Sequence, residues 1–224
     1  MNRGMDDSEW PQLPILESTD WFIPRRIWCI GRNYRAHALE MGDTGNKPPL
    51  VFSKHPMALI PADAEGRCTL AYPRQCESLH HEVELVLAIG AHGKMIGSAV
   101  GLDMTRRALQ RRLKDRRGPW TLAKDFEGAA PIGPIRLGMP LQSGPITLAV
   151  NGEIRQSGDV SQMLWGSEEL LKYVEQYDRL AAGDLIFTGT PSGVDAVSIG
   201  DVLSAQILGY PTLEVTIVDP DDAV

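Results

Sequence analysis

Two glutamates stand two residues apart in the stretch HHEVELVLAIG, residues 80–90. In an extended strand, residues two apart point to the same face, so Glu82 and Glu84 are predicted to lie side by side in an otherwise apolar run. Two carboxylates about 6 Å apart repel by roughly 3 kcal/mol at an effective dielectric of 20, and burial adds to this cost unless a cation neutralises them. The pattern therefore fits a metal site or, as is more common for a glutamate pair taken alone, the solvated end of a strand.

A third carboxylate, Asp103, ends the apolar stretch SAVGLD just before a predicted helix. Taken alone, this position is typical of a residue that caps the helix. Together with Glu82 and Glu84, Asp103 would form an oxygen-only ligand set, which suits Mg²⁺ or Mn²⁺ better than Zn²⁺. His80 and His81 precede the glutamates and either support such a site or simply begin the strand.

His37 and Glu40 are three residues apart in NYRAHALEMG, a predicted short helix that Asn33 would cap and Gly42 would end. This spacing puts both side chains on one face. A carboxylate beside an imidazole orients the ring and raises its basicity, so the pair could act as a general base. The same spacing also fits an ordinary exposed pair.

Lys124 lies in PWTLAKDFEGAAPIGP, where its ammonium could bind an oxyanion of a substrate. Its alternative partners are Asp125 or Glu127 at the surface. Thr190 lies in TGTPSGV, a turn whose backbone N–H groups could cradle a carboxylate or could simply join two strands.

Arg106, Arg107 and Gln110 open the helix predicted in TRRALQRRLKDRRGP, directly after Asp103. At least one of these donors should point toward whatever Asp103 binds. The rest of the helix is expected to place Leu109 and Leu113 on one face and to turn its other arginines to solvent.

The elements that must position these side chains are mostly short strands, including RIWCIG, LVFSK and ITLAV. Asn151-Gly152 favours the two-residue turn of a hairpin. A further helix is predicted in SEELLKYVEQYDRL, with Ser167 as its cap and an inward face made of Leu170, Leu171, Val174 and Tyr177. Strands and helices do not alternate, so the predicted fold class is mixed α/β, dominated by strands of antiparallel character, with a few helices packed outside.

The chain has 224 residues, a net charge of −7 and three cysteines without C-x-x-C spacing. Its length fits one domain, expected over residues 25–224, with residues 1–24 as a leader that packs on the body. The acidic balance argues against nucleic acid and anionic membranes as partners. No apolar run approaches the roughly 20 residues of a membrane helix, and the polar start lacks the apolar core of a signal peptide. These features, with the free cysteines, predict a cytoplasmic protein.

Six stretches, in this order along the chain, resemble motifs of the fumarylacetoacetate hydrolase family: IGRNYRAHALEMG, HHEVELVLAIG, GLDMTRRALQ, PWTLAKDFEGAAPIGP, VNGEIRQSGD and GDLIFTGTPSGV. The resemblance implies a β-roll of mixed sheets, a homodimer and a Mg²⁺ or Mn²⁺ site. Carried onto this chain, the implied metal ligands are Glu82, Glu84 and Asp103, the implied catalytic residues are His37 and Glu40 on a lid together with Lys124, and the implied substrate contacts are Arg107, Gln110 and Thr190.

Within that family, RRIWCIGRNYRAHALEMGD and RQSGDVSQMLWGSEELL look most like fumarylpyruvate hydrolases of gentisate breakdown. The resemblance implies a metal-dependent hydrolase that cleaves a carbon–carbon bond of a 3-acylpyruvate, a 2,4-diketo acid, giving fumarate and pyruvate from fumarylpyruvate. An oxaloacetate decarboxylase, a hydroxymuconate isomerase/decarboxylase and a non-catalytic keto-acid-binding member are the alternatives. The segment from Glu84 to Asp103 is shorter than is usual in the family, which raises the question of whether Asp103 still reaches the site.

Overall fold

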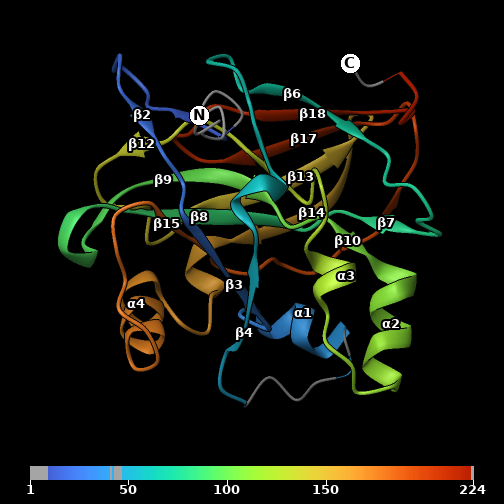
Figure 1. Cartoon of the computed structure of the whole chain (residues 1–224), viewed down its shortest axis with the longest axis horizontal. Coiled ribbons are helices and arrows are strands. Elements are labelled where there is room, and N and C mark those ends of the chain that lie inside the picture. Colours follow the sequence, from blue (N-terminus) through green and yellow to red (C-terminus); the bar gives the residue numbers. More distant parts are fainter. Residues whose placement is uncertain (1–9, 41, 43–46, 223–224) are drawn as a thin grey trace, which may run out of the picture.

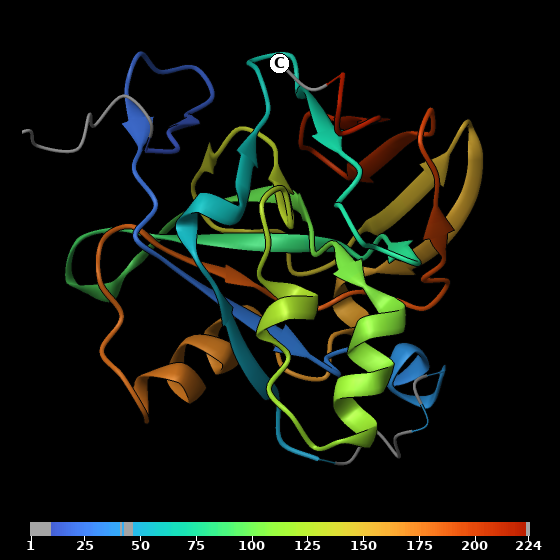
Figure 2. The same cartoon turned by 45° about the vertical axis from the view of Figure 1, so that its right-hand side comes forward.

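The computed structural model describes residues 10–40, 42 and 47–222. Two curved sheets form the body, and the helices gather on the far side of the larger sheet from the smaller one (Figure 1). Figure 2 shows the same arrangement after rotation. The predicted class is confirmed, since strands dominate and helices lie outside.

The larger, eight-stranded sheet carries most of the buried strands. Its strands in spatial order are β4 (Leu50–Lys54), β3 (Arg26–Gly31), β15 (Asp184–Phe187), β8 (Val83–Ile89), β9 (Met95–Leu102), β11 (Ala130–Ile132) and β5 (Leu59–Pro61), and β12 (Arg136–Leu137) also pairs with β9. The pairs β3 with β15 and β5 with β11 are parallel, and the other neighbours are antiparallel. The sheet is therefore mixed, as the family resemblance implies.

The smaller, five-stranded sheet contains the predicted hairpin. Its strands in spatial order are β14 (Glu153–Asp159), β13 (Pro145–Val150), β17 (Val202–Ile207), β18 (Leu213–Val218) and β6 (Arg67–Ala71). The turn between β13 and β14 has φ 52° at Asn151 and 81° at Gly152, the left-handed values that a type I′ turn requires. The Asn-Gly prediction is confirmed.

Strand β8 is buried on both faces, which explains its nearly continuous apolar sequence. One face belongs to the main core, which the five-stranded sheet covers; its side chains on β8 are Val83, Leu85, Leu87 and Ile89. The other face joins a second core through Val86 and Ala88. Glu84 lies on the same face of β8 as Val86 and Ala88, the face that joins the second core. An acidic residue therefore comes first on a face that is otherwise apolar.

Four α-helices and several short elements complete the described chain. The helices are α1 (Arg35–Glu40), α2 (Arg107–Asp115), α3 (Thr121–Lys124) and α4 (Ser167–Glu175), and the 3₁₀ turns are Pro56–Ala58, Ala91–Gly93 and Val160–Gln162. A small sheet joins β10 (Thr105–Arg106), β7 (Leu79–His80) and β16 (Ala196–Val197), and β1 (Leu13–Pro14) pairs with β2 (Trp21–Phe22).

Two predicted helix caps are wrong. The cap of α4 is Gly166, whose N–H donates to the Glu169 carboxylate at 2.8 Å, while Ser167 is already the first helical residue. Helix α1 starts at Arg35, and the Asn33 side chain instead bonds the backbone at Trp165 and Thr188. At α1 the local sequence pattern is overruled by partners distant in the chain, whereas the cap of α4 is a local one that lies one residue earlier than predicted.

The predicted inward face of α4 is correct except at its end. Leu170 and Val174 are buried and Leu171 is half-buried, but 75% of Tyr177 is exposed. The helix stops at Glu175, so Tyr177 lies beyond the helical turn that would have carried it inward.

Residues 10–24 pack on the body through Leu13 and Phe22, which are buried in the second core. Residues 1–9 of the expected leader lie outside the described residues, and the domain boundary stays a prediction. The cysteines Cys29, Cys68 and Cys76 are free thiols. Within the described ranges, none of the helices has the length and apolar character needed to cross a membrane.

Candidate metal centre and active site

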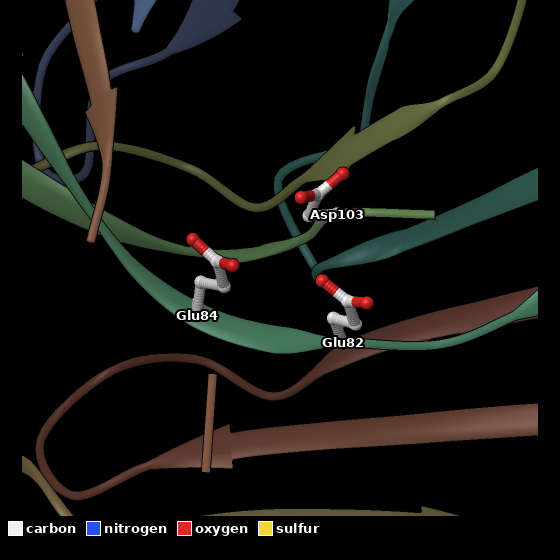
Figure 3. A group of neighbouring side chains, drawn as sticks. All are labelled: Glu82, Glu84 and Asp103. Carbon is white, nitrogen blue, oxygen red and sulfur yellow. The ribbon is translucent and has the colours of Figure 1, made fainter. Parts of the chain in front are cut away.

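The three predicted ligands meet at the open end of the hairpin formed by β8 and β9. Glu84 pairs with Gly101, and the Asp103 N–H donates to the Glu82 carbonyl at 2.9 Å. Because directly opposite residues of an antiparallel pair point to the same face, this register puts Asp103 on the face that carries both glutamates. Figure 3 shows the two glutamate side chains rising from one strand toward Asp103. The short connection therefore still delivers the third carboxylate.

All three carboxylates are buried. Glu82 is 5% exposed, and Glu84 and Asp103 are each 2% exposed. One oxygen from each residue lies within 4.8 Å of the others. The alternative of a solvated strand end is therefore wrong. Asp103 is not a helix cap either, because α2 begins four residues later and its N-cap is Arg106.

Three cations surround the carboxylates. Lys124 Nζ donates to Glu82 Oε2 at 2.9 Å and to Asp103 Oδ2 at 2.6 Å. Lys54 Nζ lies 2.8 Å from Asp103 Oδ1, at an angle that makes an ion pair rather than a hydrogen bond, and Arg107 forms an ion pair with Glu82 Oε1. The carboxylates and these cations match in number, so the group as a whole is close to neutral.

The charge is nevertheless unevenly compensated. Burial alone would raise the pKa of Glu82, but the charges of Lys124 and Arg107 outweigh it and lower that pKa below its ordinary value. Burial raises the pKa of Glu84 well above its ordinary value, and the charges of Asp103 and Glu82 add to the rise. Within the described chain, the recorded partner of the Glu84 carboxylate is the Gly189 N–H at 2.7 Å, and no cation pairs with it.

These residues fit a bound divalent metal. Two oxygens in the octahedral shell of Mg²⁺ lie about 3 to 4 Å apart, which is compatible with a cluster whose oxygens all lie within 4.8 Å of one another. The buried Glu84 carboxylate also lies beside two other carboxylates and has no cation paired with it. A bound metal ion would supply that missing positive charge. The donor set consists of oxygen alone and so matches Mg²⁺ or Mn²⁺.

His37 and Glu40 lie together beside the carboxylates. His37 Nδ1 is 3.0 Å from Glu40 Oε2, and the Gly193 N–H donates to the other Glu40 oxygen at 3.3 Å. His37 is 8% exposed and lines the same pocket as the three carboxylates. The alternative of an ordinary exposed pair is therefore wrong for the histidine, although Glu40 remains partly exposed.

Helix α2 turns a polar face toward the pocket. Arg107 is 5% and Gln110 3% exposed, and both line the pocket, whereas Leu109 and Leu113 are only half-buried. Arg107 also donates to Gln110 Oε1 at 2.7 Å. The face that α2 buries most deeply is thus the polar one and not the leucine face, because the carboxylate cluster beneath this helix requires polar partners.

Lys124 is a buried part of the cluster rather than a surface residue. It is 3% exposed and lines the pocket. Asp125, one of its alternative surface partners, instead accepts the His55 N–H at 2.9 Å. The surface alternative is therefore wrong, and the binding of a substrate oxyanion by Lys124 stays a prediction.

The turn with Thr190 is tied to the start of β8 through Gln156. The Gln156 amide donates to Thr190 Oγ1 at 2.8 Å, and its carbonyl accepts the Val83 N–H at 3.1 Å and lies 2.9 Å from His81 Nδ1. Thr190 lines the pocket. His81 therefore contacts the site indirectly, through Gln156. His80 is half-buried, and its ring forms a hydrogen bond with the Ser78 hydroxyl.

Lys54 and Gln156 are site residues that sequence reasoning missed. Lys54 ends β4, and Gln156 lies in the middle of a hairpin strand, so neither neighbours the recognised carboxylates in sequence. The one available signal was that each is a polar side chain within a predicted strand. This signal is weak, because charged and amide side chains in strands are usually exposed to solvent.

The chain matches a known protein family over most of its length. Residues 26–218 match the family described as fumarylacetoacetate (FAA) hydrolase C-terminal. A crystal structure of fumarylpyruvate hydrolase from Pseudomonas aeruginosa in complex with Mn²⁺ and pyruvate is 40% identical, with a TM-score of 0.92 over 97% of this chain and 100% of that chain.

Two further relatives carry different activities. Fumarylpyruvate hydrolase of Ralstonia sp. is 38% identical over 78% of this chain and 95% of the relative. The mitochondrial oxaloacetate tautomerase of Rattus norvegicus is 37% identical over 86% of this chain and 91% of the relative. With a family match that spans most of its length and relatives above 30% identity, the chain belongs to the fumarylacetoacetate hydrolase family.

Proposed function

We propose that the chain hydrolyses the bond between C3 and C4 of a 3-acylpyruvate and releases pyruvate and a carboxylic acid. The observation that carries this proposal is the meeting of three buried carboxylates with the His37–Glu40 pair in one pocket. Family membership and the similarity to two fumarylpyruvate hydrolases support the class, a metal-dependent hydrolase acting on carbon–carbon bonds.

Glu82, Glu84 and Asp103 are the residues that would hold Mg²⁺ or Mn²⁺. When bound, the metal would supply Lewis-acid stabilisation of the negative charge that develops on the pyruvate portion as the carbon–carbon bond breaks. Since three neighbouring cations already match the three carboxylates, a divalent ion would leave the group with a net charge near +2. A site of that charge suits an anionic keto acid.

His37 is the proposed general base. A Glu40 carboxylate can only accept a hydrogen bond, so His37 Nδ1 carries the proton of this pair and Nε2 is left as the acceptor. Nε2 would take a proton from water, and the resulting hydroxide would add to C4 of the substrate. The C3–C4 electron pair then leaves as the enolate of pyruvate, and the proton that Nε2 took from water is returned to C3, which completes pyruvate.

Lys124 is the proposed donor to the oxygen on C4. Two of the three ammonium N–H groups contact Glu82 and Asp103, which leaves one for the pocket that Lys124 lines. As hydroxide adds, negative charge gathers on this oxygen, and a fixed ammonium would stabilise it. Arg107, Gln110 and Thr190 are the proposed substrate contacts.

A second candidate is chemistry on oxaloacetate. It is favoured by relatives such as the rat oxaloacetate tautomerase and the oxaloacetate decarboxylase of Dictyostelium discoideum, which is 34% identical. Neither decarboxylation nor tautomerisation needs an attacking water, so the dependence on His37 as a water-activating base separates them from hydrolysis.

The test follows loss of the enol absorbance of fumarylpyruvate and acetylpyruvate, and pyruvate release from oxaloacetate, with Mn²⁺ and with EDTA. We expect acylpyruvate cleavage that EDTA abolishes and that His37→Asn lowers by about 10²–10⁴-fold. His92→Asn is the matched control, because His92 lies on the hairpin turn away from the pocket. Cleavage that survives both EDTA and Glu84→Ala, or turnover of oxaloacetate alone, would overturn the proposal.

Fumarylpyruvate as the natural substrate, a place in gentisate breakdown, a homodimer, a cytoplasmic location and the absence of nucleic-acid or membrane partners stay predictions. The non-catalytic alternative loses its main support, because the short hairpin retains Asp103 in the carboxylate cluster.

A further inference from the structure

The pocket is chemically asymmetric along helix α2. Among the described residues that line it, the acidic ones are the three carboxylates at its inner end. Arg107 marks that end by its ion pair with Glu82. Gln110 and Lys114 follow on the same helical face, three and seven residues later, and both line the pocket.

Lys114 therefore stands near the outer end of the pocket. At a rise of 1.5 Å per residue, it lies about 10 Å farther along the helix axis than Arg107. Figures 1 and 2 both show the C-terminal part of α2 on the side of the molecule away from the two sheets. A ligand that starts at the carboxylate cluster and extends outward along α2 would end beside Lys114.

The Lys114 ammonium has no acidic partner in the described part of the chain. Lys114 is half-buried, and no hydrogen bond or ion pair is recorded for it, whereas Arg112 on the same helix pairs with Glu77 at 2.6 Å. Arg32 also lines the pocket but is already engaged in another interaction. Lys114 is thus a cation available to a ligand.

The pocket also has an apolar part of its lining. Phe52 and Trp120 line the pocket and meet edge to face, with ring centroids 6.1 Å apart, and Leu50 lies beside them. Such a lining suits a planar hydrocarbon segment. Inner metal ligands, an apolar part of the lining and an outer ammonium together match a molecule with an anionic group at each end.

We propose that Lys114 binds a second carboxylate at the far end of the acyl group. The chain then prefers 3-acylpyruvates whose acyl group ends in a carboxylate to those with an uncharged acyl group. The six carbon–carbon bonds of a seven-carbon diacid span on the order of 8 Å when extended, which fits the distance along α2. This inference rests on the proposed hydrolysis and assigns Lys114 as its specificity-determining residue.

The test compares two substrates in three variants with Mn²⁺ present. Lys114→Met removes the charge and keeps the stem, Lys114→Arg keeps the charge, and Arg111→Met removes a cation from the exposed side of the same helix. For fumarylpyruvate, we expect Lys114→Met to lower kcat/KM about tenfold, mainly through KM, because a charge-assisted contact is lost. For acetylpyruvate, which has no distal carboxylate, the change should stay within about twofold.

Lys114→Arg should keep most of the preference, and Arg111→Met should change both substrates equally and by less than about twofold. The inference is overturned if Lys114→Met lowers both substrates alike, if it lowers neither, or if Arg111→Met reproduces its effect on fumarylpyruvate. Cleavage of acetylpyruvate by the unaltered chain keeps the proposed function standing in each of these cases. If the unaltered chain cleaves neither substrate, the proposed function and the inference both fail.

Discussion

Replacing Glu84 with glutamine should make the metal-free protein more stable and should remove its stabilisation by Mn²⁺. Glutamine keeps the shape of the side chain and can still accept the Gly189 N–H. It removes a buried negative charge that has no cation in contact and that lies beside Glu82 and Asp103. A ligand residue that costs stability in the absence of its metal is the expected sign of a functional site.

The size of the effect follows from the spacing. Two unit charges at the cluster's limit of 4.8 Å repel by about 3.5 kcal/mol at an effective dielectric of 20. Lys54 and Lys124 offset part of the charge on the neighbours, so we expect roughly 2 kcal/mol, or a rise in Tm of about 4–8 °C for a chain of this size. Because the pKa of Glu84 is raised in the folded state, its cost is absent below the ordinary pKa and grows as pH rises toward the raised value.

The assay is thermal unfolding at pH 6 and pH 8, in EDTA and in Mn²⁺. At a Mn²⁺ concentration of about 100 times Kd, the unaltered protein should gain about 2.7 kcal/mol, while Glu84→Gln should gain little. Glu214→Gln, an exposed position on β18, is the control and should change neither condition. If Glu84→Gln proves less stable than the unaltered protein in EDTA, or if Mn²⁺ still raises its Tm by the full amount, the reasoning is refuted.

Three further predictions follow from the same cluster. Mn²⁺ binding at pH values between the ordinary and the raised pKa of Glu84 should release protons, so calorimetry in buffers of different ionisation enthalpy should show proton release that fades as pH rises. Lys54→Met leaves the buried Asp103 carboxylate with one cation fewer and should cost about 3–5 kcal/mol, seen as a drop in Tm on the order of 10 °C, whereas exposed Lys172→Met should change Tm little. Gln156→Leu leaves the buried groups it joins without partners and should cost several kcal/mol in denaturant unfolding; no loss would mean that this amide is dispensable.

The fold was predictable where the determinants are local. The Asn151-Gly152 turn and the alternation in β8 depend on residues within a few positions, and both are confirmed. The cap of α4 is also local but lies one residue earlier than predicted, at Gly166, whereas the cap predicted for α1 is wrong for the opposite reason. Asn33 has hydrogen-bond partners more than 130 residues away, which no local pattern contains.

The residues of the candidate site likewise divide into those that the sequence indicates and those that it does not. Spacing alone supported a shared face for Glu82 and Glu84, but it could not tell burial from exposure, because that depends on what the rest of the chain places over the strand. Residue type and position made Asp103, His37 and Lys124 candidates, and the order of the motifs favoured their site roles over the structural alternatives through resemblance to a family. Neither spacing nor motif order indicates Lys54, since its ion pair with Asp103 joins the last residue of β4 to the residue that follows β9, and these two strands are not neighbours in the sheet.

The short connection between Glu84 and Asp103 illustrates why sequence length alone misjudges a site. In an antiparallel hairpin, residues near the open end stay opposite each other however far the closed end extends, provided that the pairing register is unchanged. Here the closed end is reduced to the turn at Ala91–Gly93, while Glu84 still faces Gly101. A Cβ at Gly101 would lie 2.6 Å from Val86 Cγ2 and 2.9 Å from Phe187 Cε1, so a side chain here would have to displace these two side chains beside the carboxylates. Register and this close approach, rather than the length of the connection, hold the third carboxylate in place.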